Sequence, residues 1–370
     1  MQPKIGIARA LYSYYHYPLF KTFFASLDTS VILSPQTSKA ILNTGIECSP
    51  AEICLPVKAL LGHIAYLKDK VDYLFLPRIV CIKDKGKIRF GCPKAIVLPD
   101  LIKATFDQLP PILELIWDER IGTLKKSFSL IGKILSKNNR ASHKAYELAQ
   151  IAQSKADRLL KQGFTPDQIF QEESTPSLPT KSPSAKLNNF TQNTDSKNLT
   201  IGIVGHPYLL YDNELSLGII DQLEKLGTTV LTPSILTPET INHSIAKNDE
   251  LTWFYEKEIL GSASYFLNNK NIDGLLLVTS FACGTGAVVN EIIYHELARY
   301  SHVPILTLLL DEHSAETGIM TRLESFIDLI SLSKKSSSFG KVLLRTKPEF
   351  RKSTSKRIAA EIYSDSEFRR

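Results

Sequence analysis

The sequence predicts an α/β protein with two parallel-sheet domains, and three observations carry this prediction. Short apolar runs alternate with segments of helical periodicity, which is the arrangement that produces a parallel sheet. The pattern of the N-terminal part recurs after residue 199. A chain of 370 residues is also long enough for two domains of ordinary size.

The elements of the N-terminal part follow one another without long gaps. Apolar residues at a spacing of three or four predict helices, and short β-branched or aromatic runs predict strands. In chain order, we expect a strand at 4–8, an aromatic-rich helix at 12–27, a strand at 31–33, a short helix at 38–43, a helix after 52–56 and a strand at 71–76.

The same order of elements returns in the C-terminal part. Ile5-Gly6-Ile7 matches Ile201-Gly202-Ile203, and the run at 71–76 resembles the run at 272–277. A strand at 304–310 and a helix at 322–332 complete this part. We therefore expect one α/β unit to be used twice.

Composition sets the boundaries between the parts. Residues 112–163 are helical in pattern and rich in Ala, Lys and Leu, whereas 172–198 are rich in Ser, Thr, Pro and Asn, which is typical of a flexible linker. We expect a first domain at 1–110, a helical segment at 111–171, a disordered linker at 172–198, a second domain at 199–332 and a basic tail at 333–370.

The charge and hydropathy of the chain disfavour two classes of protein. No apolar run approaches the roughly 18 residues of a membrane helix, and the N-terminus leads straight into a strand, so we expect a cytoplasmic protein without a membrane partner. The net charge of +6 comes from the tail, and the rest of the chain is nearly neutral. Nucleic-acid binding by the body is therefore not expected, while the tail is either solvated or a weak site for an acidic partner or RNA.

One stretch of the C-terminal part, residues 279–287, has a position typical of functional sites. It follows the apolar run 274–278 and precedes a helical pattern at 288–298. Cys283 would therefore lie at the carboxyl end of a strand and before a helix N-terminus, where open α/β sheets place their chemistry. Positive potential at that point would stabilise a thiolate, which could be a metal ligand, a nucleophile or neither.

Three of the five cysteines share this local design. Cys54, Cys92 and Cys283 each lie beside proline or glycine at a predicted loop-to-helix junction, and Gly284 and Gly286 would let backbone N–H groups approach a ligand. The chain has no C-x-x-C pair, so zinc-ribbon and ferredoxin patterns are absent. The spacing alone leaves both a three-cysteine metal site and ordinary buried cysteines open. Nucleotide binding is disfavoured because the turn lacks the Lys-Ser/Thr ending of a P-loop.

Further polar residues follow other predicted strands. Because the carboxyl ends of parallel strands meet at one edge of a sheet, they could share a cleft with Cys283, and the alternative is ordinary helix capping. The candidate catalytic residues are His206, Tyr208, Glu312, His313 and Arg322.

Taken together, these motifs resemble the 2-hydroxyacyl-CoA dehydratase superfamily, and within it the acyl-CoA dehydratase activase-related proteins. The chain is also similar to dehydratase D-components and double-cubane cluster proteins. The resemblance covers about residues 4–110 and 199–330. Its motifs are Glu52-x-Cys54-Leu55-Pro56-x-Lys58, Gly62-His63, Cys92-Pro93-Lys94, Gly205-His206-Pro207-Tyr208, Phe281-x-Cys283-Gly284 and Asp311-Glu312-His313.

The resemblance implies two flavodoxin-like domains that face each other across a [4Fe-4S] cluster. Cys54, Cys92 and Cys283 would bind the metal, with Gly284 and Gly286 beside it. The protein would be a low-potential reductase or a dehydratase-like component, either an (R)-2-hydroxyacyl-CoA dehydratase-like lyase or an ATP-coupled reductase component of anaerobic metabolism.

The implied partners are a separate ATPase activator that supplies electrons, an acyl-CoA substrate and a second subunit in a homo- or heterodimer. The alternatives are a non-catalytic electron-transfer or activator-associated partner protein and a CoA- or nucleotide-binding domain with incidental cysteines. One departure concerns substrate contacts, because the family often continues with Gly-Pro after the Cys-Gly pair of its third motif, whereas Thr285-Gly286 follows Cys283-Gly284 in this chain.

Overall fold

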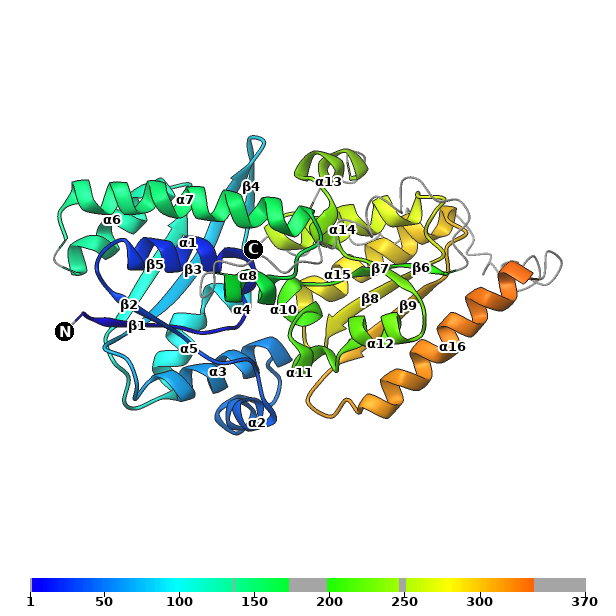
Figure 1. Cartoon of the computed structure of the whole chain (residues 1–370), viewed down its shortest axis with the longest axis horizontal. Coiled ribbons are helices and arrows are strands. Elements are labelled where there is room, and N and C mark those ends of the chain that lie inside the picture. The colour runs from blue at the N-terminus through cyan, green and yellow to red at the C-terminus, as the bar shows by residue number, and fades with distance from the viewer. Residues whose placement is uncertain (1, 136, 173–197, 246–250, 336–370) are drawn as a thin grey trace, which may run out of the picture. The chain divides into compact units, whose positions relative to one another are not determined.

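The computed structural model describes residues 2–135, 137–172, 198–245 and 251–335. Met1–Ile327 form one compact unit and Asp328–Arg370 a second, and the description below concerns the first. It contains two sheets, called A and B here, each with helices packed against it (Figure 1). The predicted α/β class with two parallel-sheet sets is confirmed. The predicted linker and basic tail lie almost wholly outside the described residues.

Sheet A is built by the N-terminal half, in the order β2-β1-β3-β5 with parallel pairing. A hairpin adds β4 antiparallel to the far end of β3. The elements are β1 (Lys4–Ile7), α1 (Ser13–Ala25), β2 (Ser30–Leu33), α2 (Lys39–Cys48), α3 (Leu55–Leu67), β3 (Tyr73–Asp84), β4 (Lys87–Phe90), α4 (Pro93–Ile96), α5 (Leu98–Thr105), β5 (Ile112–Asp118), α6 (Leu124–Ile134), α7 (Asn139–Lys161) and α8 (Pro166–Glu172).

Sheet B is built by the C-terminal half, in the order β7-β6-β8-β9, and all its pairings are parallel. Its order repeats that of the parallel strands of sheet A. The elements are β6 (Thr200–Val204), α10 (Pro207–Leu210), α11 (Asn213–Ser216), α12 (Ile219–Lys225), β7 (Thr229–Leu231), the 3-10 helix η1 (Pro233–Ile235), α13 (Pro238–Ser244), α14 (Phe254–Leu267), β8 (Gly274–Ser280), α15 (Gly284–Ile292), the π-helix η2 (Ile293–Leu297), the 3-10 helix η3 (Ala298–Tyr300), β9 (Ile305–Leu310) and α16 (Glu316–Lys335).

The internal repeat extends to individual hydrogen bonds at the start of each sheet. The backbone N–H of Lys4 donates to Asp72 Oδ2 at 2.7 Å, and the N–H of Thr200 donates to Asp273 Oδ2 at 2.8 Å. In both halves the aspartate precedes the central strand and ties it to the first strand. The two α/β units thus use the same side chain at the same step of the fold.

A second shared contact closes the helix that precedes the second strand of each unit. The hydroxyl of Thr29 donates to the carbonyl of Phe24, and the hydroxyl of Thr228 donates to the carbonyl of Leu223, each at 2.8 Å. Each threonine precedes the second strand of its sheet and follows a helix that ends a few residues earlier. The recurrence of two separate contacts at equivalent positions supports the predicted use of one unit twice.

Sheet A differs from the sequence prediction at its two longest strands. Residues 112–118 were expected to be helical, but they form β5, which pairs with β3 from Leu74 to Cys81. The reason is an alternating pattern in which Leu113 and Leu115 are buried while Ile116 is exposed. β3 also continues to Asp84, beyond the expected strand 71–76, because it carries the hairpin to β4.

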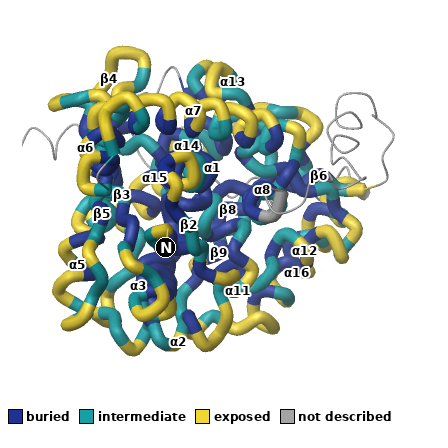
Figure 2. The backbone as a smooth tube through the Cα atoms, turned by 60° about the vertical axis from the view of Figure 1, so that its left-hand side comes forward, coloured by how far each residue is buried: buried dark blue, intermediate teal, exposed yellow. Residues whose placement is uncertain are grey.

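The core of the N-terminal half is aromatic. Phe20, Phe23 and Phe24 on α1 are fully buried, and Phe75 of β3 packs edge-on against Phe20 and Phe24 with ring centroids 4.8 and 5.0 Å apart. α7 lies along α1 and covers it (Figures 1 and 2). The aromatic residues of the predicted helix at 12–27 are thus the ones that fill this core.

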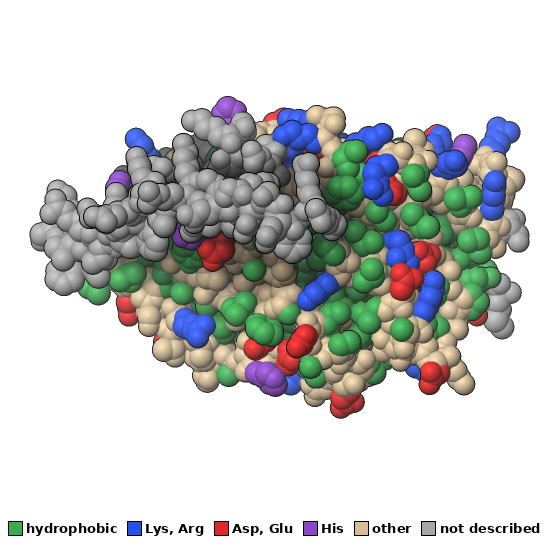
Figure 3. Space-filling model, turned by 180° about the vertical axis from the view of Figure 1, so that it is seen from behind, with side chains coloured by type: hydrophobic (Ala, Val, Ile, Leu, Met, Phe, Trp, Pro, Cys, Tyr) green, Lys and Arg blue, Asp and Glu red, His purple; other side chains and the backbone are tan. Residues whose placement is uncertain are grey.

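Two expectations about membrane spans and surface charge can be compared with the described part of the chain. Within the described residues, no helix has the length and apolar character needed to cross a membrane. On the described surface seen in Figure 3, Lys and Arg side chains are interspersed with Asp and Glu and with hydrophobic side chains.

Helices α2 and α3 approach each other so closely that glycine is required at the crossing. A Cβ atom at Gly62 would lie 1.9 Å from the carbonyl oxygen of Ile41, and one at Gly45 would lie 1.9 Å from the carbonyl oxygen of Lys58. Backbone cannot move aside as a flexible side chain can. The glycine before His63 is therefore a packing requirement of the helix that begins at Cys54.

We expect Gly62→Ala to destabilise the protein by roughly 1–3 kcal/mol, because overpacking of this size forces backbone shifts. Gly318→Ala is the matched control, since nothing lies within 4 Å of a Cβ at that helical position. The control should be neutral or slightly stabilising. Urea unfolding of both variants checks this, and equal midpoints would contradict the close approach of α2 and α3.

A buried network links the two halves through Asp212, the N-cap of α11. Its Oδ2 accepts hydrogen bonds from the Thr37 hydroxyl and, at 3.3 Å, from the Tyr14 hydroxyl, both of the N-terminal half. Thr37 Oγ1 also lies 3.0 Å from His63 Nε2. Burial raises the pKa of Asp212 to about 6, although the hydrogen bonds from Thr37, Leu215 and Tyr14 lower it.

This raised pKa predicts a pH-dependent difference between the wild type and Asp212→Asn. The folded state keeps the Asp212 proton to a higher pH than the unfolded state does, so wild-type stability falls as the pH rises from about 4 through 6. Asparagine caps a helix as well as aspartate and does not titrate. We expect the free energy of unfolding of Asp212→Asn to rise relative to that of the wild type by up to about 1.4 kcal/mol per pH unit in this window. Urea unfolding at several pH values measures this difference. A difference that stays constant from pH 4 to 8 would contradict the raised pKa of Asp212.

Candidate functional site

The three cysteines singled out from the sequence occupy the same position in three helices. Cys54 is the N-cap of α3, Cys92 the N-cap of α4 and Cys283 the N-cap of α15. All three have extended backbone and none caps its helix with a hydrogen bond of ordinary geometry. Proline in the first turn of α3 and of α4 fixes where these two helices begin.

Hydrogen bonds between the halves bring the loops of these cysteines together. Lys94, two residues after Cys92, donates to the carbonyl of Ala282 at 2.7 Å and to the carbonyl of Glu52 at 3.4 Å. The backbone N–H of Leu55 donates to the Ser280 hydroxyl at 3.2 Å. The loops that carry Cys54 and Cys92 thus both meet the turn that carries Cys283.

A buried ion pair holds the same faces together further from the sulfurs. Lys58 of α3 is 2% exposed, and its ammonium pairs with Glu312, which follows β9. The same ammonium donates to the carbonyl of Ala51 at 3.1 Å. Glu312, a candidate catalytic residue by sequence, is therefore bound to a lysine of the other half in this structure.

The turn at Cys283 differs from the glycine loop that the sequence suggests. α15 begins at Gly284, so Gly284 and Gly286 lie in its first turn, and the left-handed residue of the turn is Ala282, with φ of 61°. Gly286 has another role, because a Cβ there would lie 2.9 Å from Cys283 Sγ and 3.0 Å from Thr279 Oγ1. The second glycine leaves the space that the sulfur occupies.

The thiols are close enough to influence one another, and burial raises the pKa of Cys54 and of Cys283. Burial raises the pKa of Cys54 to about 12, and the nearby Cys283 and Cys92 raise it further. Burial also raises the pKa of Cys283, although the Gly286 N–H and the Thr285 hydroxyl lower it, while Cys92 again raises it. The expectation that a helix N-terminus would stabilise a free thiolate here is therefore wrong, because desolvation outweighs it.

His206 and Tyr208 lie beside the thiols. His206 is the buried N-cap of α10, its ring stacks on Tyr208 at 4.8 Å, and its Nδ1 lies 3.1 Å from the Tyr15 hydroxyl. Burial raises the pKa of Tyr208 well above its usual value, with further contributions from Tyr15 and from Cys283. These two candidates therefore share the surroundings of Cys283.

Two buried polar groups at this site escaped the sequence analysis. Glu256 of α14 is 1% exposed, with Oε1 3.7 Å from His206 Nε2 and Oε2 without a hydrogen-bond partner in the described part of the chain. The Tyr12 hydroxyl also has none among the described residues, and its pKa is raised by burial, by Cys92 and by Glu256. Glu256 could have been identified from its place in α14, because a glutamate in a helix with nearly every face buried needs a special reason to be there.

His313 and Arg322 lie apart from this group. Both are exposed, His313 in the turn after β9 and Arg322 on α16. The predicted convergence at one sheet edge thus assembles Cys54, Cys92, Cys283, His206 and Tyr208, and leaves these two residues at the surface.

The resemblance implies an iron–sulfur cluster on the three cysteines, and the described residues can be compared with that expectation. Among the described residues, no group of three or more His, Cys, Asp and Glu side chains is arranged to hold one metal ion. A cluster spaces its thiolates further apart, because each binds a different iron. Three partly buried thiols from three loops, with backbone N–H groups nearby, are the chemistry that such a cluster requires.

Comparison with known proteins gives one family. The family model described as "CoA enzyme activase uncharacterised domain (DUF2229)" matches residues 4–236. The match spans sheet A, Cys54 and Cys92, and it ends before Cys283. No curated protein matches the chain.

This match corrects the main function expected from the sequence. A dehydratase-like or reductase component fed by a separate ATPase activator would belong with the enzymes that an activase serves, whereas the matched domain is that of a CoA enzyme activase. The activase-related part of the resemblance is borne out, and the activator-associated alternative fits the match better.

The Lys58–Glu312 pair predicts a large asymmetry between single and double variants. We expect Lys58→Met to destabilise the protein by about 3 kcal/mol or more, because it leaves the Glu312 carboxylate without its partner in a mostly buried place. Lys58→Met combined with Glu312→Gln should recover part of this loss. Urea unfolding of both variants and of Glu312→Gln alone gives the coupling energy, and strictly additive effects would contradict the pairing.

Proposed function

The chain belongs to the CoA enzyme activase domain family, and from this premise we propose that it is a non-catalytic, activator-associated electron-transfer protein with a [4Fe-4S] cluster on Cys54, Cys92 and Cys283. Its partner would be a CoA enzyme, to which it passes electrons without itself transforming an acyl-CoA. The observation that supports the proposal is that the three loops with an N-cap cysteine meet where the two halves contact each other.

The surroundings of the thiols support a metal site over a nucleophile. A catalytic cysteine needs a depressed pKa, and burial does the opposite to Cys54 and Cys283. A bound cluster would supply one-electron chemistry and would deprotonate its thiol ligands, as metals do. The raised pKa values are thus an obstacle to acyl transfer at these sulfurs, whereas a bound metal would displace the thiol protons and hold the sulfurs as thiolates.

Several groups of the chain would balance the negative charge of such a cluster. The ammonium of Lys94 is fixed between the carbonyls of Ala282 and Glu52, next to all three loops. The backbone N–H groups of Val57 and Gly286 face the sulfurs of Cys54 and Cys283 and lower their pKa. Positive charge and N–H donors around sulfur raise the potential of a cluster.

An exposed apolar surface beside Cys283 supports transfer to a partner protein. Phe281, two residues before Cys283, is 54% exposed, and Val288 on α15 is 44% exposed. Leu309 at the end of the edge strand β9 is 50% exposed. Exposed apolar side chains grouped around a redox centre suit a docking surface, and here the partner would be the CoA enzyme.

Only the type of cluster is taken from the sequence resemblance to dehydratase D-components and double-cubane proteins. The motifs around Cys54, Cys92 and Cys283 carry that similarity. The role drawn from it, a component that dehydrates an acyl-CoA, is not retained. Acyl-CoA is instead a substrate of the partner.

The cluster part is tested by anaerobic purification and reconstitution with iron and sulfide. We expect about four irons and four sulfides per chain and a thiolate-to-iron absorption band, and we expect Cys54→Ser, Cys92→Ser and Cys283→Ser each to lose most of this iron. Cys48→Ser is the control and should retain it, since Cys48 is the last residue of α2 and is not at the start of a helix. The proposal would be contradicted if the wild type bound no iron, or if Cys283→Ser bound as much iron as the wild type.

The non-catalytic part needs a separate measurement. The reduced, reconstituted protein is mixed with a one-electron acceptor dye and, in a parallel sample, with crotonyl-CoA and lactoyl-CoA as acyl-CoA probes. We expect the dye to be reduced and both thioesters to be recovered unchanged. Conversion of either thioester by this chain alone would overturn the non-catalytic assignment while leaving the cluster intact.

A further inference from the structure

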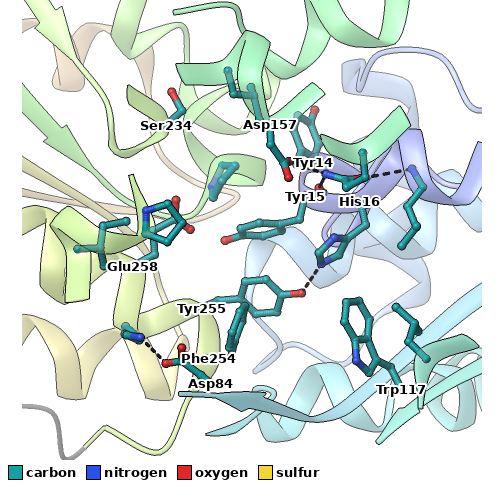
Figure 4. A pocket seen from close by; sticks show the side chains of 18 of the residues that line it. Tyr14, Tyr15, His16, Asp84, Trp117, Asp157, Ser234, Phe254, Tyr255 and Glu258 are labelled. Carbon is teal, nitrogen blue, oxygen red and sulfur yellow. Dashed lines mark hydrogen bonds and ion pairs between the residues drawn. The ribbon is translucent and has the colours of Figure 1, made fainter. Parts of the chain in front are cut away.

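A large cavity lies between the two halves and lies apart from the three thiols. Its volume is about 1110 Å³, which is enough for a cofactor-sized ligand. Its wall comes from α1, the end of β5, α7, η1 and the start of α14 (Figure 4). None of Cys54, Cys92 and Cys283 lines it. The proposed electron transfer therefore does not account for this space.

Aromatic rings form one side of the cavity. The rings of Tyr15 and Tyr255 lie against each other with centroids 4.3 Å apart. The Tyr255 hydroxyl lies 2.8 Å from His16 Nε2, and the His16 ring lies 5.3 Å from that of Trp117. Burial lowers the pKa of His16 to about 4, so this imidazole is neutral near pH 7. The aromatic wall thus presents rings without a positive charge of its own.

Two carboxylates from different helices face the same space. Asp157 of α7 and Glu258 of α14 both line the cavity, and Figure 4 shows them around the rings of Tyr15 and Tyr255. Asp157 accepts a hydrogen bond from Gln153 at 2.8 Å. Glu258 makes no hydrogen bond or ion pair with the described residues. Burial raises the pKa of Glu258 to about 7, and Asp157 raises it further.

The basic side chains of the wall leave these carboxylates largely unneutralised. Lys257 pairs with Asp84, and Arg120 pairs with Asp118 through two hydrogen bonds. Lys161 is near enough to lower the pKa of Asp157, but burial outweighs it and the pKa is raised. Lys83 also lines the cavity, and among the described residues neither Lys83 nor Lys161 forms an ion pair with Asp157 or Glu258. A ligand placed against Asp157 and Glu258 would therefore supply the directly paired positive charge that these two carboxylates lack.

We propose that this cavity binds an organic cation with an aromatic or other apolar body, its ammonium group held by Glu258 and Asp157 and its body against the rings of Tyr15 and Tyr255. Carboxylates give charge-assisted hydrogen bonds to an ammonium, and aromatic faces attract it through their quadrupoles. An anion of the same shape meets the two carboxylates and is repelled. The cavity thus selects by charge as well as by shape.

The test compares two probes that share a ring and differ in charge, using the full chain. Tryptamine carries an ammonium and indole-3-propionate a carboxylate on the same indole. In calorimetry at pH 8 we expect saturable binding of tryptamine and at least tenfold weaker binding of indole-3-propionate. Equal or tighter binding of the anion, or no binding of tryptamine at millimolar concentration, would overturn the proposal.

Variants locate the binding. Glu258→Gln combined with Asp157→Asn keeps the shape of the wall and removes both charges, and we expect it to weaken tryptamine binding at least tenfold. Glu324→Gln, an exposed carboxylate on α16, is the matched control and should bind as the wild type does. Unchanged urea midpoints exclude a folding defect, and an unchanged affinity in the double variant would show that the cation binds elsewhere. Iron content is independent of all these outcomes, so the cluster and the cavity fail or stand separately.

Discussion

Two lysines of the N-terminal half hold the C-terminal half at its strand ends, and the thiol site depends on them. Lys94 reaches the carbonyl of Ala282, and the buried Lys58 pairs with Glu312. A buried ammonium is costly unless it is paired, so Lys58 favours the one arrangement of the facing loops that brings Glu312 to it. Lys94 is only partly buried, and it joins the loops by hydrogen bonds to two carbonyls. The partners are strand-end loops of sheet B, which follow β8 and β9. These contacts, together with the hydrogen bond from Leu55 to Ser280, bring together the loops of three cysteines that are far apart in the sequence.

Much of the fold could be predicted from the sequence because the same α/β unit occurs in both halves of the chain. The aspartates at 72 and 273 and the threonines at 29 and 228 make equivalent contacts, so each half of the sequence supports the interpretation of the other. β5 was missed because residues 112–118 lie next to long helices and are too short for their alternation to stand out. The hairpin from β3 to β4 has no counterpart in sheet B, so the repeat could not indicate it.

Residues of the candidate site could be predicted where a local sequence pattern marks them. Cysteine before proline or glycine at a helix start is visible in the sequence, and so is a histidine after a strand. Glu256 and Tyr12 have no such local pattern, because their importance comes from burial against the other half of the molecule. The raised pKa values of Cys54 and Cys283 likewise could not be predicted from local sequence. A helix N-terminus is read from the sequence, whereas the desolvation that outweighs it depends on how closely the two halves pack.

The cavity and the thiol site share a wall, and this places a physical link between them. Tyr15 and Tyr255 line the cavity, while the Tyr15 hydroxyl contacts His206, whose ring stacks on Tyr208 beside Cys283. Tyr255 packs on Tyr12, whose pKa is raised by Cys92, with ring centroids 5.8 Å apart. Rings packed at these distances cannot shift singly, because interiors are dense and leave little free volume. A molecule that fills the cavity would therefore contact rings that pack against the neighbours of the sulfurs, although the loops that assemble the thiols and the helices that line the cavity are different parts of the contact between the halves.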